Sequence, residues 1–599
     1  MGDLLGRSWL VRRAGAARLL TGTAAGLVLA IGLGAGTGAA QTRGPSYEPN
    51  FAADLTAPRP CALDTRDPYE RAGYQQEGWK GPDYVRYPGA CQRLRFAYGP
   101  LAVTPGQNDV LVGPVTIEKP NRPGYITRIR PNLMRADGTV PPVEQVHLHH
   151  GTWLSQPTYG SGPFFAAGEE KTIGSFPRGY GMPVKATDTW QLLYMVHSAV
   201  EQPMEVFITY DVDFIPREKA AGIKPVYPVW LDVRPSGYPV FNVQRRFGGS
   251  DSKCTWPKQN CANFDPYGNK IPGQGQPANG KGEDLKLPER GQSLGAIKNF
   301  TGGTLIVIGG HLHPSGIQNE IDLVRGAKKT RIYDGRAHYW SRRDSSKDGG
   351  PPDSWDFSME VDSLPRWGVH VKPGDALRSN ATYDTSKVAS YEDMGIAVTA
   401  IAPDTPAGKP TAPGVDPFRA RRDRTPNCRS GGVRAGQLCT VGRVSHGHYK
   451  ENGHYGGHAG HWTLSTGGPT NNVGIVDFTY QPGDLSAGRP IPSVKLGTKL
   501  SFTNFEGAGI YHTVTSCAFP CLGETGAAFP LSDGRTSTGR KLDVDSAELG
   551  YGAPYVGAAS QTISWQVPVT GATGFKPGEK VTYFCRVHPF MRGAFEVSK

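Results

Sequence analysis

The segment KPGEKVTYFCRVHPFMRGAFEV, residues 576–597, decides how the C-terminal part of the chain folds. Short runs of β-branched and aromatic residues flank the spacing Cys585-x-x-His588-x-x-Met591, which predicts two strands joined by a tight loop. In such a loop a thiolate, an imidazole and a thioether can converge on one point. The sequence therefore predicts a metal site between these two strands.

Cys585 stands apart from the other cysteines of the chain. The remaining eight of the nine form couples that are close in sequence: Cys61 with Cys91, Cys254 with Cys261, Cys428 with Cys439, and Cys517 with Cys521. We expect these couples to be disulfides of an exported protein, although the spacing alone does not fix the pairing. A thiol left without a partner in such a protein usually has a function or is hidden, and its His and Met neighbours favour a function.

One more imidazole completes a set of copper ligands, and the stretch SFTNFEGAGIYHTV, residues 501–514, places His512 at a predicted strand end. A thiolate and two imidazoles with a weak axial thioether suit a copper ion that cycles between Cu(I) and Cu(II) with little rearrangement. Residues 470–599 resemble a cupredoxin, and Cys-x-x-His-Pro-Phe-Met-Arg-Gly is similar to the amicyanin branch of blue copper proteins. The resemblance implies a type 1 copper held by His512, Cys585, His588 and Met591.

Two features separate this segment from related copper proteins. His512 and Cys585 are 73 positions apart, which exceeds the family's usual gap, and two further cysteines lie between them. We interpret the extra length as an inserted loop pinned by a disulfide. Multicopper oxidases and copper nitrite reductases flank the copper Cys with His, whereas the flanking residues here are Phe584 and Arg586. That difference argues against a laccase-type trinuclear cluster.

The 15 histidines are unevenly distributed, and three groups lie in predicted strands: His147, His149 and His150 in VHLHHG, His197 in LLYMVHS, and His311 and His313 in TLIVIGGHLHP. Residues i and i+2 of a strand point to the same face, so His311 and His313 can ligate one ion. His149 and His150 point to opposite faces of a regular strand, so their joint use requires a bulge or different ring nitrogens. The pair of His147 and His149 is the alternative. We interpret this crowding as metal binding.

The order of these histidines resembles the copper type II, ascorbate-dependent monooxygenases, the peptidylglycine and dopamine β-hydroxylase family, over residues 95–403. The resemblance implies an electron-supplying and an oxygen-activating copper site, whose ligands are His149, His150 and His197, and His311, His313 and Met394, respectively. Peptide-hydroxylating members place an Arg two residues before the His-x-His, and this position is Gly309 here. A peptide C-terminus is therefore not the expected substrate.

The two core sites differ in their ligand types, and this difference suits them to different roles. A soft thioether favours Cu(I), the state that binds O2, so a site with Met394 suits oxygen activation, whereas an all-imidazole site suits electron storage. We expect an exported copper-dependent monooxygenase that hydroxylates a C–H bond of an unknown small organic substrate with O2. Its type 1 copper domain takes electrons from an external donor in place of free ascorbate. The alternative is a non-catalytic extracytoplasmic protein that binds copper and transfers electrons.

Length and composition set the broader frame. The 599 residues suggest roughly four domains, and 79 Gly with 51 Pro indicate a turn-rich protein rather than a helical bundle. The net charge of +12 is thinly spread, and four Arg against one Asp in the first 18 residues account for +3 of it. We therefore expect no nucleic-acid partner.

The N-terminus predicts an export signal over residues 1–40, because an Arg-bearing start, an apolar stretch over about 19–35 and small residues follow one another. The protein is then secreted, periplasmic or at the cell surface, and it contacts a membrane only if the leader is retained as an anchor. The five histidines within residues 446–461 form a tract that either captures Cu(II) or Zn(II) loosely or serves as a plain linker.

The predicted fold class is all-β. An irregular extension, two β domains, a linker rich in Pro, Arg and His, and the cupredoxin follow the leader at residues 41–95, 96–220, 221–403, 404–465 and 466–599. Alternating short apolar runs and Gly/Pro turns predict β-sandwiches for the two β domains. By resemblance these are jelly-roll-like and face each other across the core copper sites, and the last domain is a Greek key.

Overall fold

The computed structural model describes residues 53–61, 87–104, 107, 112–141, 146–160, 162–168, 172–198, 200, 202–233, 240–243, 252–259, 284–313, 315–339, 357–385, 390–419, 443–444, 465–485, 489–505, 512–517, 546, 549, 564–585, 588 and 591–599. Strands dominate this part of the chain, and its helices are α1 (Ala53–Thr56) and the 3-10 turns η2 (Arg217–Lys219) and η5 (Gly571–Thr573). The predicted all-β fold class is confirmed. None of the described helices has the length and apolar character needed to cross a bilayer. The predicted export signal and the histidine tract lie outside the described residues.

Two sheets form the first β-sandwich. The larger sheet has the order β1 (Arg59–Pro60), β2 (Gln92–Val103), β10 (Met204–Pro216), β4 (Gly124–Met134), β8 (Tyr180–Val184) and β11 (Lys224–Pro225), and β7 (Gly174–Ser175) pairs with β4. The smaller sheet has the order β3 (Val112–Ile117), β9 (Thr189–Ser198), β5 (Val146–Gln156) and β6 (Pro163–Gly168). Alternate residues of β9, such as Trp190 and Leu192, are buried in the core between the two sheets.

A twelve-stranded sheet forms the second domain. Its main path is β12 (Tyr227–Asp232), β22 (Ser390–Pro403), β16 (Gly303–Leu312), β19 (Phe357–Ser363), β18 (Lys328–Tyr339), β17 (Gly316–Arg325), β21 (Ala376–Asp384) and β14 (Lys253–Trp256). Four short strands pair beside this path: β13 (Val240–Val243), β15 (Leu285–Lys286), β20 (Val369–Val371) and β23 (Arg443–Val444). Leu305 of β16 and Leu323 of β17 share one core cluster, so the sheet folds over on itself.

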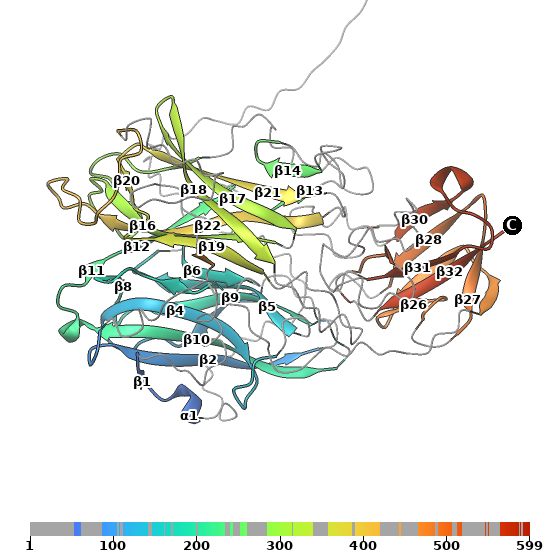
Figure 1. Cartoon of the computed structure of the whole chain (residues 1–599). Coiled ribbons are helices and arrows are strands. Elements are labelled where there is room, and N and C mark those ends of the chain that lie inside the picture. Colours follow the sequence, from blue (N-terminus) through green and yellow to red (C-terminus); the bar gives the residue numbers. More distant parts are fainter. Residues whose placement is uncertain are drawn as a thin grey trace, which may run out of the picture.

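The first two domains share apolar contacts. The core cluster of the first sandwich also contains Ile306, Ala400 and Ala402 of the second domain, together with Ala412. Residues 404–419, which we assigned to the linker, lie against the second domain, where Arg325 pairs with Asp416. Figure 1 shows the two domains stacked on each other.

The third domain is a separate β-sandwich beside the first two (Figure 1). Its sheets have the orders β24 (Thr466–Pro469), β27 (Ile491–Lys495), β32 (Arg592–Ser598), β31 (Lys580–Phe584) and β29 (Thr515–Cys517), and β26 (Thr479–Gln481), β25 (Asn472–Val476), β28 (Thr498–Asn504) and β30 (Ser564–Val569). Phe502 and Tyr583, from opposite sheets, meet in one buried core.

Cys61, Cys91, Cys254 and Cys585 fit the predicted division into disulfides and one unpaired thiol. Cys61 and Cys91 form a disulfide, which confirms that couple. Cys254 is also disulfide-bonded, and Cys585 is a buried free thiol. The predicted couple of residues 428 and 439 lies outside the described residues.

Candidate metal centres

A β-bulge in β5 arranges the histidines of the first domain. β5 pairs with β9 so that His147 lies opposite His197, and the register shifts between Leu148 and His150. The extra residue is His149. A bulge re-aims side chains, so the rings of His149 and His150 come within 4.2 Å of each other, measured between centroids. The structure thus contains the bulge that a joint role of this pair requires.

His147, His149 and His197 form a first group of ligating side chains. Their ligand nitrogens all lie within 4.8 Å of one another, and the three residues are 2%, 4% and 6% exposed. The ring of His149 stacks on that of His197 with 4.3 Å between centroids. The sequence assigned His149 and His197 to one site with His150, and the structure places His147 against the same two residues.

His150 lies where the first domain meets the second. Its Nε2 atom is 3.0 Å from Nε2 of His313 and 3.3 Å from Nε2 of His311. His311 is the second-to-last residue of β16, and His313 directly follows that strand. Two imidazole nitrogens that each bind one ion at about 2.0–2.1 Å lie roughly 3 Å apart, so this spacing matches shared coordination.

We call His150, His311 and His313 the second group, and it touches the first. His149, His150 and His313 also bring their ligand nitrogens within 4.8 Å of one another. We refer to the whole set as the six-histidine cluster, whose members are His147, His149, His150, His197, His311 and His313. Four of its members come from the first domain and two from the second.

Burial favours the neutral imidazole at His150 and His197. The pKa of His150 falls well below its usual value, first because burial strips water from the imidazolium and then because charge on His149 disfavours a second charge nearby. The pKa of His197 is lowered by burial and then by charges on His149, His147 and His588. Neutral imidazoles are metal ligands, so the cluster suits a cation.

Met394, the predicted thioether ligand of the oxygen-activating site, lies on β22 beside the second group. The hydroxyl of Tyr383 donates to the Met394 carbonyl at 2.6 Å and accepts the Met394 backbone N–H at 3.2 Å. The same hydroxyl accepts the backbone N–H of His313 at 2.8 Å. One buried tyrosine therefore ties the backbones of Met394 and His313 together.

The third group lies in the C-terminal sandwich and consists of His512 together with Cys585, His588 and Met591, which lie in the loop between β31 and β32. The Met591 N–H donates to the His588 carbonyl at 2.8 Å, and the Cys585 N–H donates to the Met591 carbonyl at 3.1 Å, which closes the loop. Nδ1 of His588 is 3.0 Å from Nδ1 of His512 and 3.6 Å from Sγ of Cys585. Sγ of Cys585 is 3.9 Å from Nδ1 of His512. The four predicted ligands are thus brought to one end of the sandwich, and all are buried.

The surroundings of Cys585 favour its thiolate. Burial alone raises the pKa of the thiol, but charge and hydrogen bonding from His588 and His512 outweigh burial and hold the pKa well below its usual value. The backbone N–H of Thr513 also donates to Sγ at 3.2 Å. A thiolate and two imidazoles at these separations fit one ion at about 2.0–2.3 Å from each, and the donor set with Met591 fits copper.

A strained turn covers the third group. Asp477 and Phe478 connect β25 to β26 with φ values of 48° and 54°, which side chains other than Gly rarely adopt. The Phe478 ring lies edge-on to the rings of His512 and His588, at centroid distances of 5.5 and 5.1 Å. Strain of this kind concentrates at functional sites.

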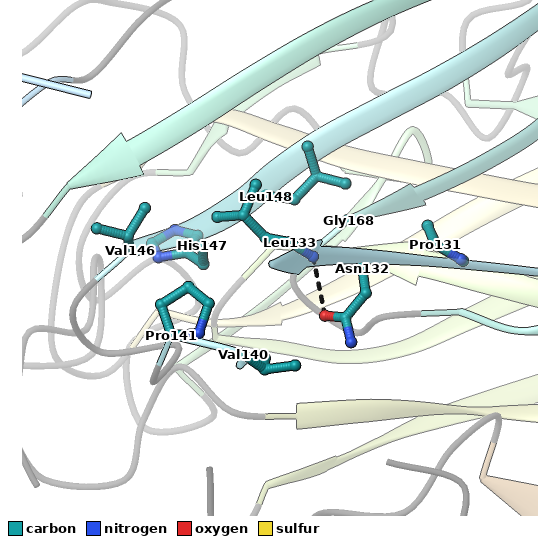
Figure 2. Close-up of a pocket in the computed structure, with 9 residues that line it drawn as sticks. All are labelled: Pro131, Asn132, Leu133, Val140, Pro141, Val146, His147, Leu148 and Gly168. Carbon is teal, nitrogen blue, oxygen red and sulfur yellow. Dashed lines mark hydrogen bonds between the residues drawn. The ribbon is translucent and has the colours of Figure 1, made fainter. Parts of the chain in front are cut away.

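A mostly apolar pocket borders the six-histidine cluster at His147 (Figure 2). Its lining residues are Pro131, Asn132, Leu133, Val140, Pro141, Val146, His147, Leu148 and Gly168. Asn132 turns its side-chain oxygen to the backbone N–H of Leu133, at 2.9 Å. The wall next to His147 is therefore formed mainly by aliphatic and proline carbons.

Comparisons with family models and with curated proteins return no match for this chain. Among solved structures, a purple cupredoxin from Nitrosopumilus maritimus is 15% identical, with 22% of this chain and 100% of that chain covered and a TM-score of 0.13. An amicyanin variant in its Cu(I) form is 18% identical over 21% of this chain and 80% of that chain, with a TM-score of 0.12. A copper-containing nitrite reductase from Thermus scotoductus SA-01 is 11% identical over 49% of this chain and 55% of that chain, with a TM-score of 0.14.

Likenesses at such low TM-scores and identities carry no argument about function. The comparisons give no support to the peptidylglycine and dopamine β-hydroxylase resemblance, which therefore rests on the residues of this chain alone. The function has to be argued from the geometry of the three groups.

Sequence reasoning did not single out Phe478 or Thr513. Thr513 directly follows a predicted ligand, and this adjacency is the signal that could have found its backbone donor. Phe478 lies 34 residues before His512 in a turn whose sequence, Asp-Phe, is not typical of its backbone conformation. No local pattern marks it, because only the folded sandwich brings its ring to the histidines.

Proposed function

We propose that this protein is an exported copper-dependent oxidoreductase that hydroxylates a C–H bond with O2 and receives electrons through its own type 1 copper domain. The observation that carries the proposal is the convergence of buried ligating side chains in two places, the six-histidine cluster and the group around Cys585.

The residues divide between electron entry and reaction. His512, Cys585, His588 and Met591 would hold the type 1 copper, and the histidines of the cluster with Met394 would hold two further coppers. Copper bound there supplies one-electron transfer and oxygen activation. Burial of His150 and His197 favours their neutral imidazole forms, which are the forms that bind a metal ion.

The proposed setting is outside the cytoplasm. The Cys61–Cys91 disulfide supports an oxidising compartment. An external electron donor would reach the C-terminal sandwich, and no nucleic acid takes part.

Oxygen uptake by the copper-loaded full chain tests the proposal. With a chemical reductant and candidate small organic substrates, we expect oxygen consumption matched by hydroxylated product. Met394→Ala should abolish turnover and leave the blue colour intact, while Met204→Ala, on β10, serves as the matched control. Unchanged turnover in Met394→Ala would show that the oxygen site is assigned wrongly.

The non-catalytic alternative predicts a different result in the same experiment. The protein would bind copper and cycle between blue and colourless states with reductant and oxidant, without oxygen consumption coupled to a product. That outcome would replace the monooxygenase proposal by a role in copper binding and electron transfer.

A further inference from the structure

We infer that His150 binds the same ion as His311 and His313, and that His147 takes its place beside His149 and His197. This inference rests on the proposed copper centre, but it divides the six histidines differently from the resemblance. One ion is then coordinated by residues of both the first and the second domain.

The bulge in β5 provides the first reason. It separates His150 from the regular strand alternation and turns its ring toward the second domain, where the Nε2 atoms of His313 and His311 lie 3.0 and 3.3 Å away. The ring centroids of His150 and these two residues are 5.0 and 5.2 Å apart. Nε2 of His150 is thus within hydrogen-bond distance of both Nε2 atoms of the second domain, an arrangement suited to one cation.

The partners of His197 provide the second reason. His147 lies opposite His197 in the β5–β9 ladder, and its ring centroid is 5.2 Å from that of His197. His149 stacks on His197 with 4.3 Å between ring centroids. These three residues form a complete set of imidazole donors within one sheet, without His150.

The division changes the role of Met394. With three imidazoles available, the ion at His150 is retained without the thioether, so Met394 tunes the site rather than holding the metal. Tyr383 hydrogen-bonds both the Met394 and His313 backbones, so the Met394 backbone stays close to the site.

Copper stoichiometry distinguishes the two divisions. In the full chain carrying Cys585→Ser, which lacks the type 1 site, we expect two tightly held Cu(II) ions per chain after loading and dialysis. His147→Ala should lower the count to one, and Met394→Ala should leave it at two. The resemblance-based division predicts the opposite for both variants. His370→Asn, outside the cluster on β20, is the control and should keep two ions.

Double variants test which histidines share an ion. His150→Ala with His311→Ala should lose one ion, because both residues serve the same site, whereas His150→Ala with His197→Ala should lose two. Two ions lost in the first pair and one in the second would overturn the inference. Far-UV circular dichroism and thermal unfolding of the same variants, compared with those of the unmodified chain, show whether they fold.

The number of copper ions bound per chain is measured independently of catalysis. Absence of oxygen uptake together with the expected counts would refute the hydroxylase proposal and leave the ligand division standing. The reversed counts together with turnover would refute the division and leave the hydroxylase standing.

Discussion

At the residue scale, Cys585 shows two opposing physical effects on one side chain. Burial in the sandwich core opposes a charged thiolate, yet the imidazoles of His512 and His588 and the Thr513 N–H favour it, and together they prevail. The site therefore holds its sulfur ready for a metal before any ion arrives. An ordinary buried cysteine would stay protonated and inert.

Replacing Cys585 by Ser should bleach the copper-loaded protein, because a hydroxyl cannot supply the thiolate whose bond to Cu(II) absorbs visible light. Visible and EPR spectra together with copper analysis check this prediction. The copper held by the six-histidine cluster should remain. Persistent blue colour in the Ser variant would remove Cys585 from the ligand set.

Phe478→Gly should weaken copper binding at the third group by about 10- to 100-fold, as loss of a partner outside the ligand shell typically does. Glycine accepts the φ of 54° without strain, so the turn itself should persist. Competition with a chelator measures the affinity. Phe505→Ala, which removes a ring that is 66% exposed, is the control. Equal affinities in all three proteins would show that the Phe478 ring has no role at the site.

At the element scale, strand register aligns buried charges across three strands of the first sandwich. Asp211 of β10 lies opposite Arg95 of β2 and Arg130 of β4, and it forms ion pairs with both. Burial by itself raises the pKa of this carboxyl, but the two guanidinium groups hold it far below its usual value. These buried ion pairs therefore link β2, β10 and β4, whose apolar side chains contribute to the hydrophobic core.

Asp211→Asn should destabilise the first domain by about 3–5 kcal/mol at neutral pH, because two buried guanidinium groups lose their charged partner. The folded-state pKa of this carboxyl is depressed, so its stabilisation is present above about pH 4 and is lost as the pH falls through the lowered pKa. The difference in stability between the unmodified protein and Asp211→Asn should therefore shrink in acid. Thermal unfolding at several pH values measures it, with exposed Glu205→Gln on the same strand as control. A stability difference that does not change with pH would contradict an origin in the charge of Asp211.

At the scale of the whole molecule, packing between domains builds the core centre. Ala400 and Ala402 of the second domain enter the core of the first, which holds the end of β16 against β5. His150 and His313 are 163 residues apart in sequence and still bring their Nε2 atoms to 3.0 Å. The third domain adds His588, whose charge reaches His197.

His197→Ala should slow the return of blue colour when O2 is added to the fully reduced protein by more than about tenfold, because it removes the side chain of the six-histidine cluster on which charge at His588 acts. Stopped-flow absorbance measures this rate. His370→Asn should reoxidise as the unmodified protein does. An unchanged rate in His197→Ala would exclude electron transfer along this route.

Much of the third site could be predicted because its ligands are local. Cys585, His588 and Met591 lie in one loop of seven residues, where the backbone alone keeps them close. The all-β class was predictable too, because alternating apolar residues and Gly/Pro turns act over short distances. The bulge at His149 was not, since it depends on the register between β5 and β9 rather than on either strand alone.

By itself, the sequence determined which side chains could bind a metal and that they would lie on strands and tight loops, because periodicity and ligand chemistry are properties of short segments. Which histidines meet depends instead on how the strands and domains pack. His150 reaches His311 and His313 through the packing of two domains, and Phe478 reaches His512 through the closure of a sandwich. Such contacts depend on the burial of apolar surface contributed by the whole chain, which no single segment specifies.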